Sequence, residues 1–497
     1  MGAYPQTIYF TGANEPVGQE VDLRGLKVEG DLPAEVRGSF YRAVPDPAFA
    51  PMFDNDHTLS GDGMVSRLSF NGDGTADFIM KFVETARYKA EKAAGKALFG
   101  KYRNPFTDDP SVQGVDRTVA NTTPVWHAGR LLMAKEDGRP YRVDPKTLET
   151  LGSYDFGGAL KSETMTAHVR IDAETGELFF YGYEADGQAS TKVAYCVVAP
   201  DGTLKSEQWF DAPYCAMMHD FTISENYALF PIYPTTADLD RLKAGGEHWH
   251  HEPELESWLG VMPRYGDVSE IKWFKGPKGC HSYHMMNAWE DAGGMLHFDA
   301  CLNNTNAFAF IREPSGIHMG PQDMKGALTR WTVDPKADGG EVVETIIGPP
   351  GDFPVIPARL QGRPYKTAFM LSMNPELQGP PLFAGPVGVS FNVLLRLDGM
   401  DTPTPKVTNA LALPPMAGFN EPVHVPATDP AKDGWLVFIM DQQIGDNQFV
   451  HEAWVVDAGN IGAGPVAKVH FPTRLRPQVH GWWVPQTQLD ALEGIGA

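Results

Sequence analysis

The chain has 497 residues, with 41 basic and 63 acidic side chains and a formal net charge of −22. This acidity argues against a nucleic-acid-binding protein, because phosphate backbones would be repelled. Hydrophobic residues make up 42% of the chain and aromatic residues 11%, which excludes an intrinsically disordered chain. The 51 glycines and 41 prolines favour many short elements joined by turns over a helical bundle.

Targeting signals are not evident in the sequence. The first residues, MGAYPQTIYFTGANEPVG, lack the basic and apolar regions of a signal peptide. No apolar run reaches about 18 residues, the length that crosses a membrane as a helix. The four cysteines (Cys196, Cys215, Cys280 and Cys301) form no CxxC pair, and we expect them to be reduced thiols in the core. We therefore expect a cytoplasmic protein without stable membrane insertion. Whether the protein forms a homodimer is left open.

Short strands and tight turns are predicted along most of the chain. Turn sequences rich in Asp, Asn, Gly and Pro predict hairpins at 71–78, 143–151, 171–179, 199–206 and 333–342. Aromatic and aliphatic runs of strand length occur at 178–185, 227–234, 295–302 and 435–442. Helical periodicity is limited to 86–100 and 236–260.

Hairpins repeated over so long a chain indicate an all-β fold of the β-propeller type. Seven blades of about 40–45 residues would use roughly 300 residues and leave long loops for a binding surface or lid. The two helical stretches would contribute to a cap of loops and helices over one face. We find no linker or low-complexity segment, so we expect a single domain over residues 1–497.

The histidines are the candidate metal ligands, although none of the fifteen forms an HExxH or C2H2 motif. His168, His219, His284 and His480 each lie in or beside a strand-like run, and 51, 65 and 196 residues separate them. A propeller could bring them together, because the inner strand of every blade faces a common axis. A lone histidine on an apolar strand is more often a hydrogen-bonded core residue, so the spacing alone leaves both interpretations open.

The segments around these histidines resemble the carotenoid cleavage oxygenase family. TAHVRIDAETGELFFYGY, MMHDFTISENYALFPIYP, HMMNAWED and VHGWWVP match, in this order, the family segments that carry four iron-binding histidines. RGSFYRAVPDPAF (37–49) and HTLSGDGMVSRLSF (57–70) resemble its amino-terminal strand pair. The resemblance implies a seven-bladed propeller, capped over its metal-bearing face, with one Fe(II) per chain held by His168, His219, His284 and His480.

Four neutral imidazoles suit Fe(II), and on an octahedral ion they leave two positions for O2 and for water or substrate. His281 and His284 face opposite sides of a strand, and the family register selects His284 as the ligand. The sequence GGEHWHHEPE places His248, His250 and His251 in what we expect to be a solvated loop.

Three carboxylates match family positions that support the metal-binding histidines. Imidazoles bound to a metal usually donate their second N–H to a carboxylate or carbonyl. Asp352 stands where the family usually has Glu. Because Asp is one methylene shorter, we expect its contact to be longer or mediated by water. The resemblance assigns this supporting role to Glu136, Asp352 and Glu421.

Two further matches point to the lignostilbene dioxygenase branch of the family. Tyr102 and Lys135 match the residues that this branch uses to hold a phenolic hydroxyl, although without the resemblance they would be a core tyrosine and a surface lysine. A polarised phenol would push electron density into the central double bond of a 4-hydroxystilbene. The resemblance thus implies cleavage with O2 to two aromatic aldehydes. Leu59 and Phe308 are candidate contacts of the substrate rings, with core packing as the default.

Two other functions stay open at this point. One is the cleavage of carotenoids or apocarotenoids, which need only an apolar tunnel. The other is a non-catalytic propeller that serves as an interaction scaffold, which would bind no iron and would tolerate replacement of the four histidines.

Overall fold

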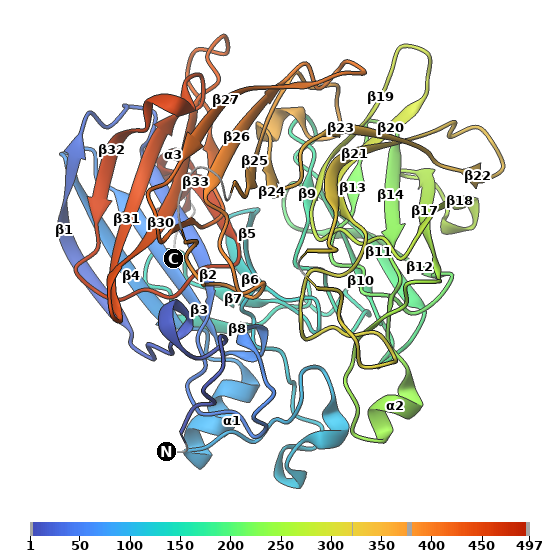
Figure 1. Ribbon diagram of the computed structural model, residues 1–497, viewed down its shortest axis with the longest axis horizontal. Coiled ribbons are helices and arrows are strands. Elements are labelled where there is room, and N and C mark those ends of the chain that lie inside the picture. Colours follow the sequence, from blue (N-terminus) through green and yellow to red (C-terminus); the bar gives the residue numbers. More distant parts are fainter. Residues whose placement is uncertain (1–2, 321, 375–379, 494–497) are drawn as a thin grey trace. The chain divides into compact units, whose positions relative to one another are not determined.

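The structure is a computed structural model that describes residues 3–320, 322–374 and 380–493, and most of its regular elements are strands (Figure 1). The chain divides into two compact units. The first comprises Met1–Tyr154, Met373–Leu394 and Asn409–Ala497, and the second comprises Asp155–Ser372 and Leu395–Thr408.

A ten-stranded sheet dominates the first unit, with the order β28-β30-β31-β32-β1-β4-β3-β2-β33 and with β29 paired to β30. A four-stranded sheet, β5-β6-β7-β8, accompanies it. The strands are β1 (Val21–Gly30), β2 (Gly38–Pro45), β3 (Gly63–Phe70), β4 (Thr75–Phe82), β5 (Thr123–His127), β6 (Arg130–Ala134), β7 (Tyr141–Val143), β8 (Thr150–Ser153), β28 (Ala417–Phe419), β29 (Val423–Val425), β30 (Trp435–Gly445), β31 (Gln448–Asp457), β32 (Pro465–His470) and β33 (Gly481–Pro485).

The second unit is built from small sheets. Their orders are β12-β11-β10-β9, β13-β14-β17-β18-β22, β15-β16 and β19-β20-β21-β23, and the sheet β24-β25-β26-β27 lies mostly in this unit. The strands are β9 (Arg170–Ile171), β10 (Leu178–Tyr183), β11 (Lys192–Val198), β12 (Leu204–Asp211), β13 (Thr222–Ile223), β14 (Tyr227–Ile232), β15 (Thr235–Thr236), β16 (His250–His251), β17 (Glu256–Pro263), β18 (Lys272–Lys278), β19 (Met285–Glu290), β20 (Leu296–Asn303), β21 (Gly326–Val333), β22 (Gly340–Glu341), β23 (Val343–Gly348), β24 (Asp352–Val355), β25 (Thr367–Ser372), β26 (Val393–Asp398) and β27 (Lys406–Ala412).

The predicted hairpins are confirmed. Four of the turn sequences join β3 to β4, β7 to β8, β9 to β10 and β11 to β12, and the fifth, 333–342, connects β21 to β23 but contains the short strand β22; all five of these strand pairs are antiparallel. In the turn before β10, Asp172 Oδ1 accepts the backbone N–H groups of Glu174 and Thr175 at 2.8 and 3.2 Å, so the side chain itself closes the turn. Four-stranded antiparallel sheets joined in this way are the repeating unit of a β-propeller, as predicted.

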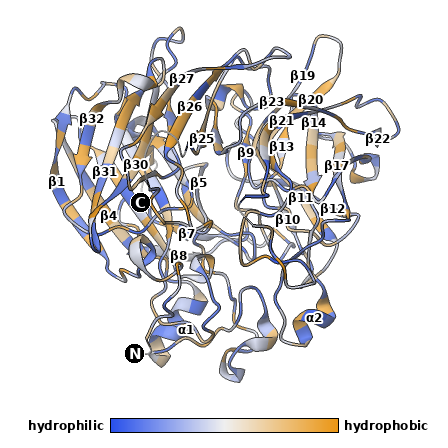
Figure 2. Cartoon of the chain, in the orientation of Figure 1, coloured by the Kyte–Doolittle hydropathy of each residue, from blue (hydrophilic) through white to orange (hydrophobic). Residues whose placement is uncertain are grey.

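Each unit has its own apolar core, and apolar residues concentrate on the strands (Figure 2). Fully buried side chains in the first unit include Phe40 and Ile439, and those in the second include Leu259 and Trp331. All four cysteines are buried, as expected, and none of them is in a disulfide. The helices formed by the described residues are too short or too polar to span a membrane.

The helices differ in part from the prediction. Within 86–100 the chain forms α1 (Ala86–Ala94), which ends because Gly95 adopts a left-handed φ of +68°. The prediction of helix over 236–260 is wrong for most of its length, since only α2 (Leu239–Lys243) forms there before β16 and β17 begin. A third helix, α3 (Gln486–Glu493), follows β33, and short 3₁₀ helices lie at Gly12–Asn14, Thr58–Ser60, Pro105–Thr107, Pro110–Val112, Val268–Glu270, Ala358–Leu360 and Ile461–Ala463.

Candidate metal centre

The four candidate histidines share one position in the fold, just before the strand that starts a sheet. His168 lies two residues before β9, His219 three residues before β13, and His284 directly before β19, all in the second unit. His480 lies directly before β33 in the first unit. A residue just before a strand does not yet follow the alternation of side chains between the two faces of the sheet. Residues far apart in sequence can therefore project from such positions towards one point.

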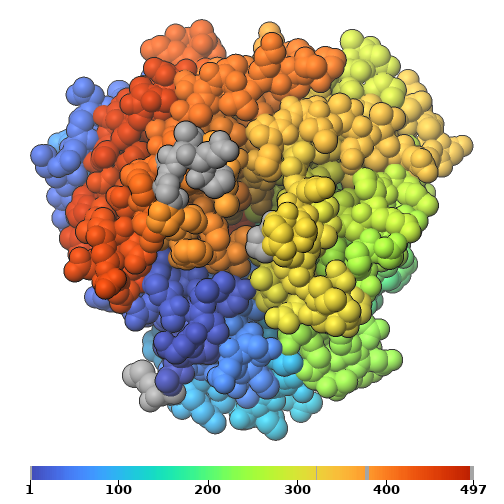
Figure 3. All heavy atoms as spheres, in the orientation of Figure 1, coloured from blue at the N-terminus to red at the C-terminus, as the bar shows by residue number. Residues whose placement is uncertain are grey.

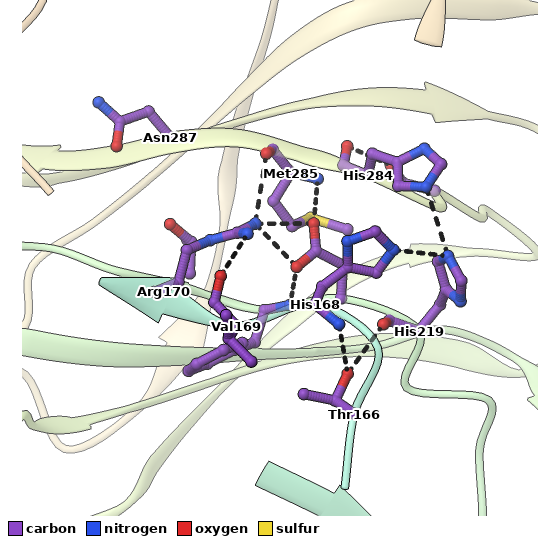
Figure 4. A network of polar contacts seen from close by, with 12 residues as sticks. Thr166, His168, Val169, Arg170, His219, His284, Met285 and Asn287 are labelled. Atoms are coloured by element: carbon purple, nitrogen blue, oxygen red, sulfur yellow. Dashed lines mark hydrogen bonds and ion pairs between the residues drawn. The ribbon is translucent and has the colours of Figure 1, made fainter. Parts of the chain in front are cut away.

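In the second unit three of these imidazoles converge. His219 Nε2 lies 3.0 Å from His168 Nε2 and 3.3 Å from His284 Nε2, and Figure 4 shows the three rings pointing towards one another. Two bonds of about 2.1 Å at right angles on one metal ion would separate their nitrogens by about 3.0 Å. His168 and His284 are buried and His219 is partly exposed. The spacing and chemistry of these donors therefore fit a shared metal ion.

A carboxylate fixes the ring of His284. Its Nδ1 donates to Asp352 Oδ1 at 2.8 Å, which leaves Nε2 as the unprotonated nitrogen that faces the other two histidines. The expectation of a longer or water-mediated contact is wrong. The shorter side chain contacts the ring directly, and the next residue, Phe353, adopts a left-handed φ of +49° and stacks on His284 with ring centroids 4.9 Å apart.

His480 has the same kind of support in the first unit. Its Nδ1 donates to Glu421 Oε1 at 3.0 Å, and the other carboxylate oxygen accepts the backbone N–H of Gly481 at 2.7 Å. The ring is only 2% exposed. Glu421 thus holds both the imidazole and the start of β33, and it leaves Nε2 of His480 as the unprotonated nitrogen.

The third predicted carboxylate, Glu136, is buried after the end of β6. Arg103 lies beside it, with Nη1 at 3.8 Å from Oε1. Its role as the support of a metal-binding histidine stays a prediction.

The residues predicted to hold a phenol come together in the first unit, although they are far apart in sequence. Lys135 Nζ donates to the Leu59 carbonyl at 3.3 Å and to Asn121 Oδ1 at 3.2 Å. The same ammonium lies 5.2 Å from the centroid of the Tyr102 ring. Asn121 also donates to the carbonyls of Leu59 and Gly61, at 3.0 and 2.7 Å, and so joins the lysine to this turn. Sequence reasoning missed Asn121.

Burial shifts the titration of this group of side chains. It lowers the pKa of Lys135 below 10.5, and the nearby Asp137 and Glu136 only partly oppose this. Burial, together with the charge of Glu136, raises the pKa of Tyr102 well above its usual value. His57 packs edge-on against Tyr102 at a centroid distance of 4.8 Å, and burial with the neighbouring Lys135 lowers its pKa to about 3. The site therefore has a Lys135 ammonium that loses its proton more readily than an exposed lysine, a protonated Tyr102 phenol and a neutral His57 imidazole.

Backbone strain accompanies these residues. Arg103, next to Tyr102, has a φ of +53°, and Ala120, next to Asn121, has a φ of +50°. A left-handed conformation at a residue other than glycine costs about 1–3 kcal/mol and tends to occur at functional sites.

Phe308, the candidate ring contact in the second unit, lies in the segment between β20 and β21 that reaches the surface shown in Figure 3 (yellow). Its ring is buried against Tyr283, with centroids 4.3 Å apart, and Tyr283 stands edge-on to His219 at 5.3 Å. Tyr283 thus packs against both Phe308 and His219. Sequence reasoning missed Tyr283, although it directly precedes His284.

The remaining histidines lie outside the converging group. His281 is fully buried, and its Nδ1 lies 3.3 Å from Thr235 Oγ1, so it is a hydrogen-bonded core residue. The expectation of a solvated loop is wrong for His248 and His251, which are 1% and 2% exposed. His248 pairs with the buried carboxylate of Glu184 at 3.1 Å, and His251 belongs to β16.

Comparisons with known proteins agree with this geometry. The sequence model of the family described as "Retinal pigment epithelial membrane protein" (RPE65) matches residues 14–485. Lignostilbene-α,β-dioxygenase isozyme III from Sphingomonas paucimobilis is 38% identical over 98% of this chain and 99% of its own. Isoeugenol monooxygenase from Pseudomonas nitroreducens is 38% identical over 96% of this chain and 98% of its own. The crystal structure of lignostilbene dioxygenase from Pseudomonas brassicacearum superposes with a TM-score of 0.91, at 36% identity, covering 98% of this chain and 100% of that chain.

Proposed function

This chain belongs to the carotenoid cleavage oxygenase family, that of RPE65, and from this premise we propose that it is a non-haem iron dioxygenase of 4-hydroxystilbenes. The reaction cleaves the central carbon–carbon double bond and places one atom of O2 on each carbon, so that two aromatic aldehydes form. The observation that carries the proposal is the convergence of three imidazole Nε2 atoms, with the opposite nitrogen of His284 held by Asp352.

The proposed metal is one Fe(II) per chain, with His168, His219, His284 and His480 as its ligands. These four histidines are a group that could hold a metal ion, and an all-imidazole set suits Fe(II). When bound, ferrous iron supplies the chemistry that activates O2. Asp352 and Glu421 keep Nδ1 of their histidines protonated, and we assign the same task to Glu136 for a third histidine.

Lys135 and Tyr102 are the proposed binding site for the 4-hydroxyl group. The lowered pKa of Lys135 makes its amine a base that can take the phenolic proton, and as an ammonium it can stabilise the phenolate. The Tyr102 hydroxyl, which stays protonated, is a donor to the same oxygen. Either form of the lysine raises electron density at the double bond. Leu59, beside Lys135, and Phe308 are the proposed ring contacts.

For the fold we propose one domain of seven blades. In this assignment the ten-stranded sheet consists of two blades, β28 to β32 and β1 to β4 with β33, and five blades correspond to the separate sheets of four or five strands within the described residues. The segments with α1 and α2 are the proposed cap over the metal-bearing face. Four buried cysteines that are not in disulfides support a reducing, cytoplasmic location.

Cleavage of a propenylphenol is a second candidate, because one relative is an isoeugenol monooxygenase. Isoeugenol, like a 4-hydroxystilbene, is a phenol conjugated to a carbon–carbon double bond, so Lys135 and Tyr102 could hold it in the same way. Carotenoids and apocarotenoids have no phenol for this pair to bind. A non-catalytic scaffold is not supported, since the relatives compared are oxygenases.

The test is to load purified protein with Fe(II), determine iron per chain, and measure O2 uptake with resveratrol. We expect one iron per chain and two hydroxybenzaldehydes, each carrying one ¹⁸O when ¹⁸O2 is supplied. The 4-methoxy analogue should be a poor substrate. One bound iron with cleavage of isoeugenol but not of resveratrol would favour the second candidate, and cleavage of an apocarotenoid alone would favour the third. A protein that binds no iron would refute the proposal.

A further inference from the structure

The carboxylate of Asp220 joins the three segments that carry the converging histidines. Arg170 Nη2 donates to both of its oxygens, each at 2.7 Å. The backbone N–H of Met285 donates to Oδ2 at 2.8 Å, and that of Phe221 to Oδ1 at 2.7 Å. Figure 4 shows Arg170 and Met285 beside His168, His219 and His284.

Each of these groups is next to a candidate ligand in the chain. Arg170 is two residues after His168, Asp220 directly follows His219, and Met285 directly follows His284. The three histidines are 51 and 65 residues apart in sequence, so the carboxylate is a short physical link between otherwise distant segments.

The neighbouring strands give these segments little other support. β9 and β13 are only two residues long, so few ladder hydrogen bonds fix the direction of His168 and His219. Besides Asp220, Thr166 joins two of the segments, since its Oγ1 accepts the N–H of His168 and donates to the carbonyl of His219, both at 3.2 Å. The side chains of Arg170 and Asp220 are only 12% and 2% exposed.

A buried ion pair of this kind adds little net stability, because desolvation offsets most of the attraction, but it can specify one arrangement of the groups around it. We propose that Asp220 and Arg170 are positioning residues that set the spacing of His168, His219 and His284 for metal binding. This inference rests on the proposed metal site. Their loss acts through the histidines and not through contact with the metal. Outer partners of metal ligands typically change metal affinity about 10–100-fold when they are removed, and we expect a loss of this size.

The chain offers a matched control in the same unit. Arg330 and Asp299 form another buried pair, with Nε and Nη2 donating to the two carboxylate oxygens at 2.7 and 2.8 Å. Both residues lie on strands, β21 and β20, and neither is next to a candidate ligand. Asp299→Asn therefore breaks a comparable ion pair whose other side-chain hydrogen bonds go to Tyr365, Met400 and Thr402 and not to the histidines.

The experiment titrates metal-free wild-type protein, Asp220→Asn and Asp299→Asn with Co(II), and follows the visible absorption of the bound ion. We expect Asp220→Asn to bind Co(II) 10–100-fold more weakly, with a shifted spectrum, and Asp299→Asn to match wild type in both. Arg170→Met should resemble Asp220→Asn, Arg170→Lys should restore most of the affinity, and the double variant should lose no more than either single variant.

Thermal unfolding of the metal-free proteins distinguishes a variant that no longer folds from one that folds but has lost the spacing of the three histidines. If Asp220→Asn does not fold, the comparison of Arg170→Met with Arg170→Lys carries the test. Wild-type affinity and spectrum in Asp220→Asn, or an equal loss in Asp299→Asn, would overturn the inference and leave the proposed metal site intact. A wild-type protein that binds neither Co(II) nor Fe(II) would instead overturn the proposed function.

Discussion

Asp352 accepts a hydrogen bond from Nδ1 of His284 at 2.8 Å, and this contact orients the ring towards His219. In the first unit Glu421 makes the matching contact with His480 at 3.0 Å. A shorter carboxylate thus makes the same direct contact as a longer one, and the residue after it, Phe353, has a left-handed φ of +49°.

Replacing Asp352 with Asn should weaken Fe(II) retention against a chelator by about 10–100-fold, because the amide no longer favours the Nδ1-protonated form of His284. The matched control is Asp291→Asn, which breaks the His297–Asp291 pair, 3.2 Å long, outside the histidine cluster. Equal iron retention in the two variants would contradict the assigned role of Asp352.

Replacing Lys135 with Met should lower kcat/KM for resveratrol by about 10²–10⁴-fold, since the hydrophobic chain keeps the volume but removes the charge and the base. The 4-methoxy analogue, which has no phenolic proton, should be turned over equally slowly by both proteins. Lys89→Met, at an exposed position of α1, serves as the control. Unchanged kinetics with resveratrol would remove Lys135 from the mechanism.

The pH profile should show which form of Lys135 acts. Burial lowers its pKa below 10.5, so the wild-type profile should contain a limb below that pH. Glu136 and Asp137 raise this pKa, and Arg103 and Arg87 lower it further. A rate that rises with pH along this limb identifies the neutral amine as the base, and a falling rate identifies the ammonium. The limb should be absent in Lys135→Met, and a profile shared by both proteins would assign it to another group.

Acid should destabilise the metal-free protein through His57. Its pKa is about 3 in the folded chain and near 6.5 when unfolded, so the unfolded state takes up the proton first. The contribution of His57 to the free energy of unfolding is therefore complete above pH 6.5 and decreases as the pH falls towards 3. His57→Gln should show a smaller loss of melting temperature between pH 7 and pH 5, measured by circular dichroism. An equal loss would show that other groups cause the acid sensitivity.

The sequence by itself determined the hairpins and the candidate ligands. Asp, Asn and Gly in the turns act over a few residues, so the turn before β10 could be recognised locally. His168, His219, His284 and His480 could be named because each lies within a motif that resembles a known family. The helix prediction for 236–260 is wrong over β17 because pairing with β14 overrides the local helical preference there.

The tertiary structure alone decided which side chains meet. Lys135 reaches Asn121 and Leu59, and Asp220 joins Arg170 to Met285, by contacts between residues 14 to 76 positions apart. Such contacts leave no local periodicity, because they depend on how several sheets place the residues at their strand entries. For the same reason the burial of His248 on Glu184 could not be foreseen from the charged residues around it.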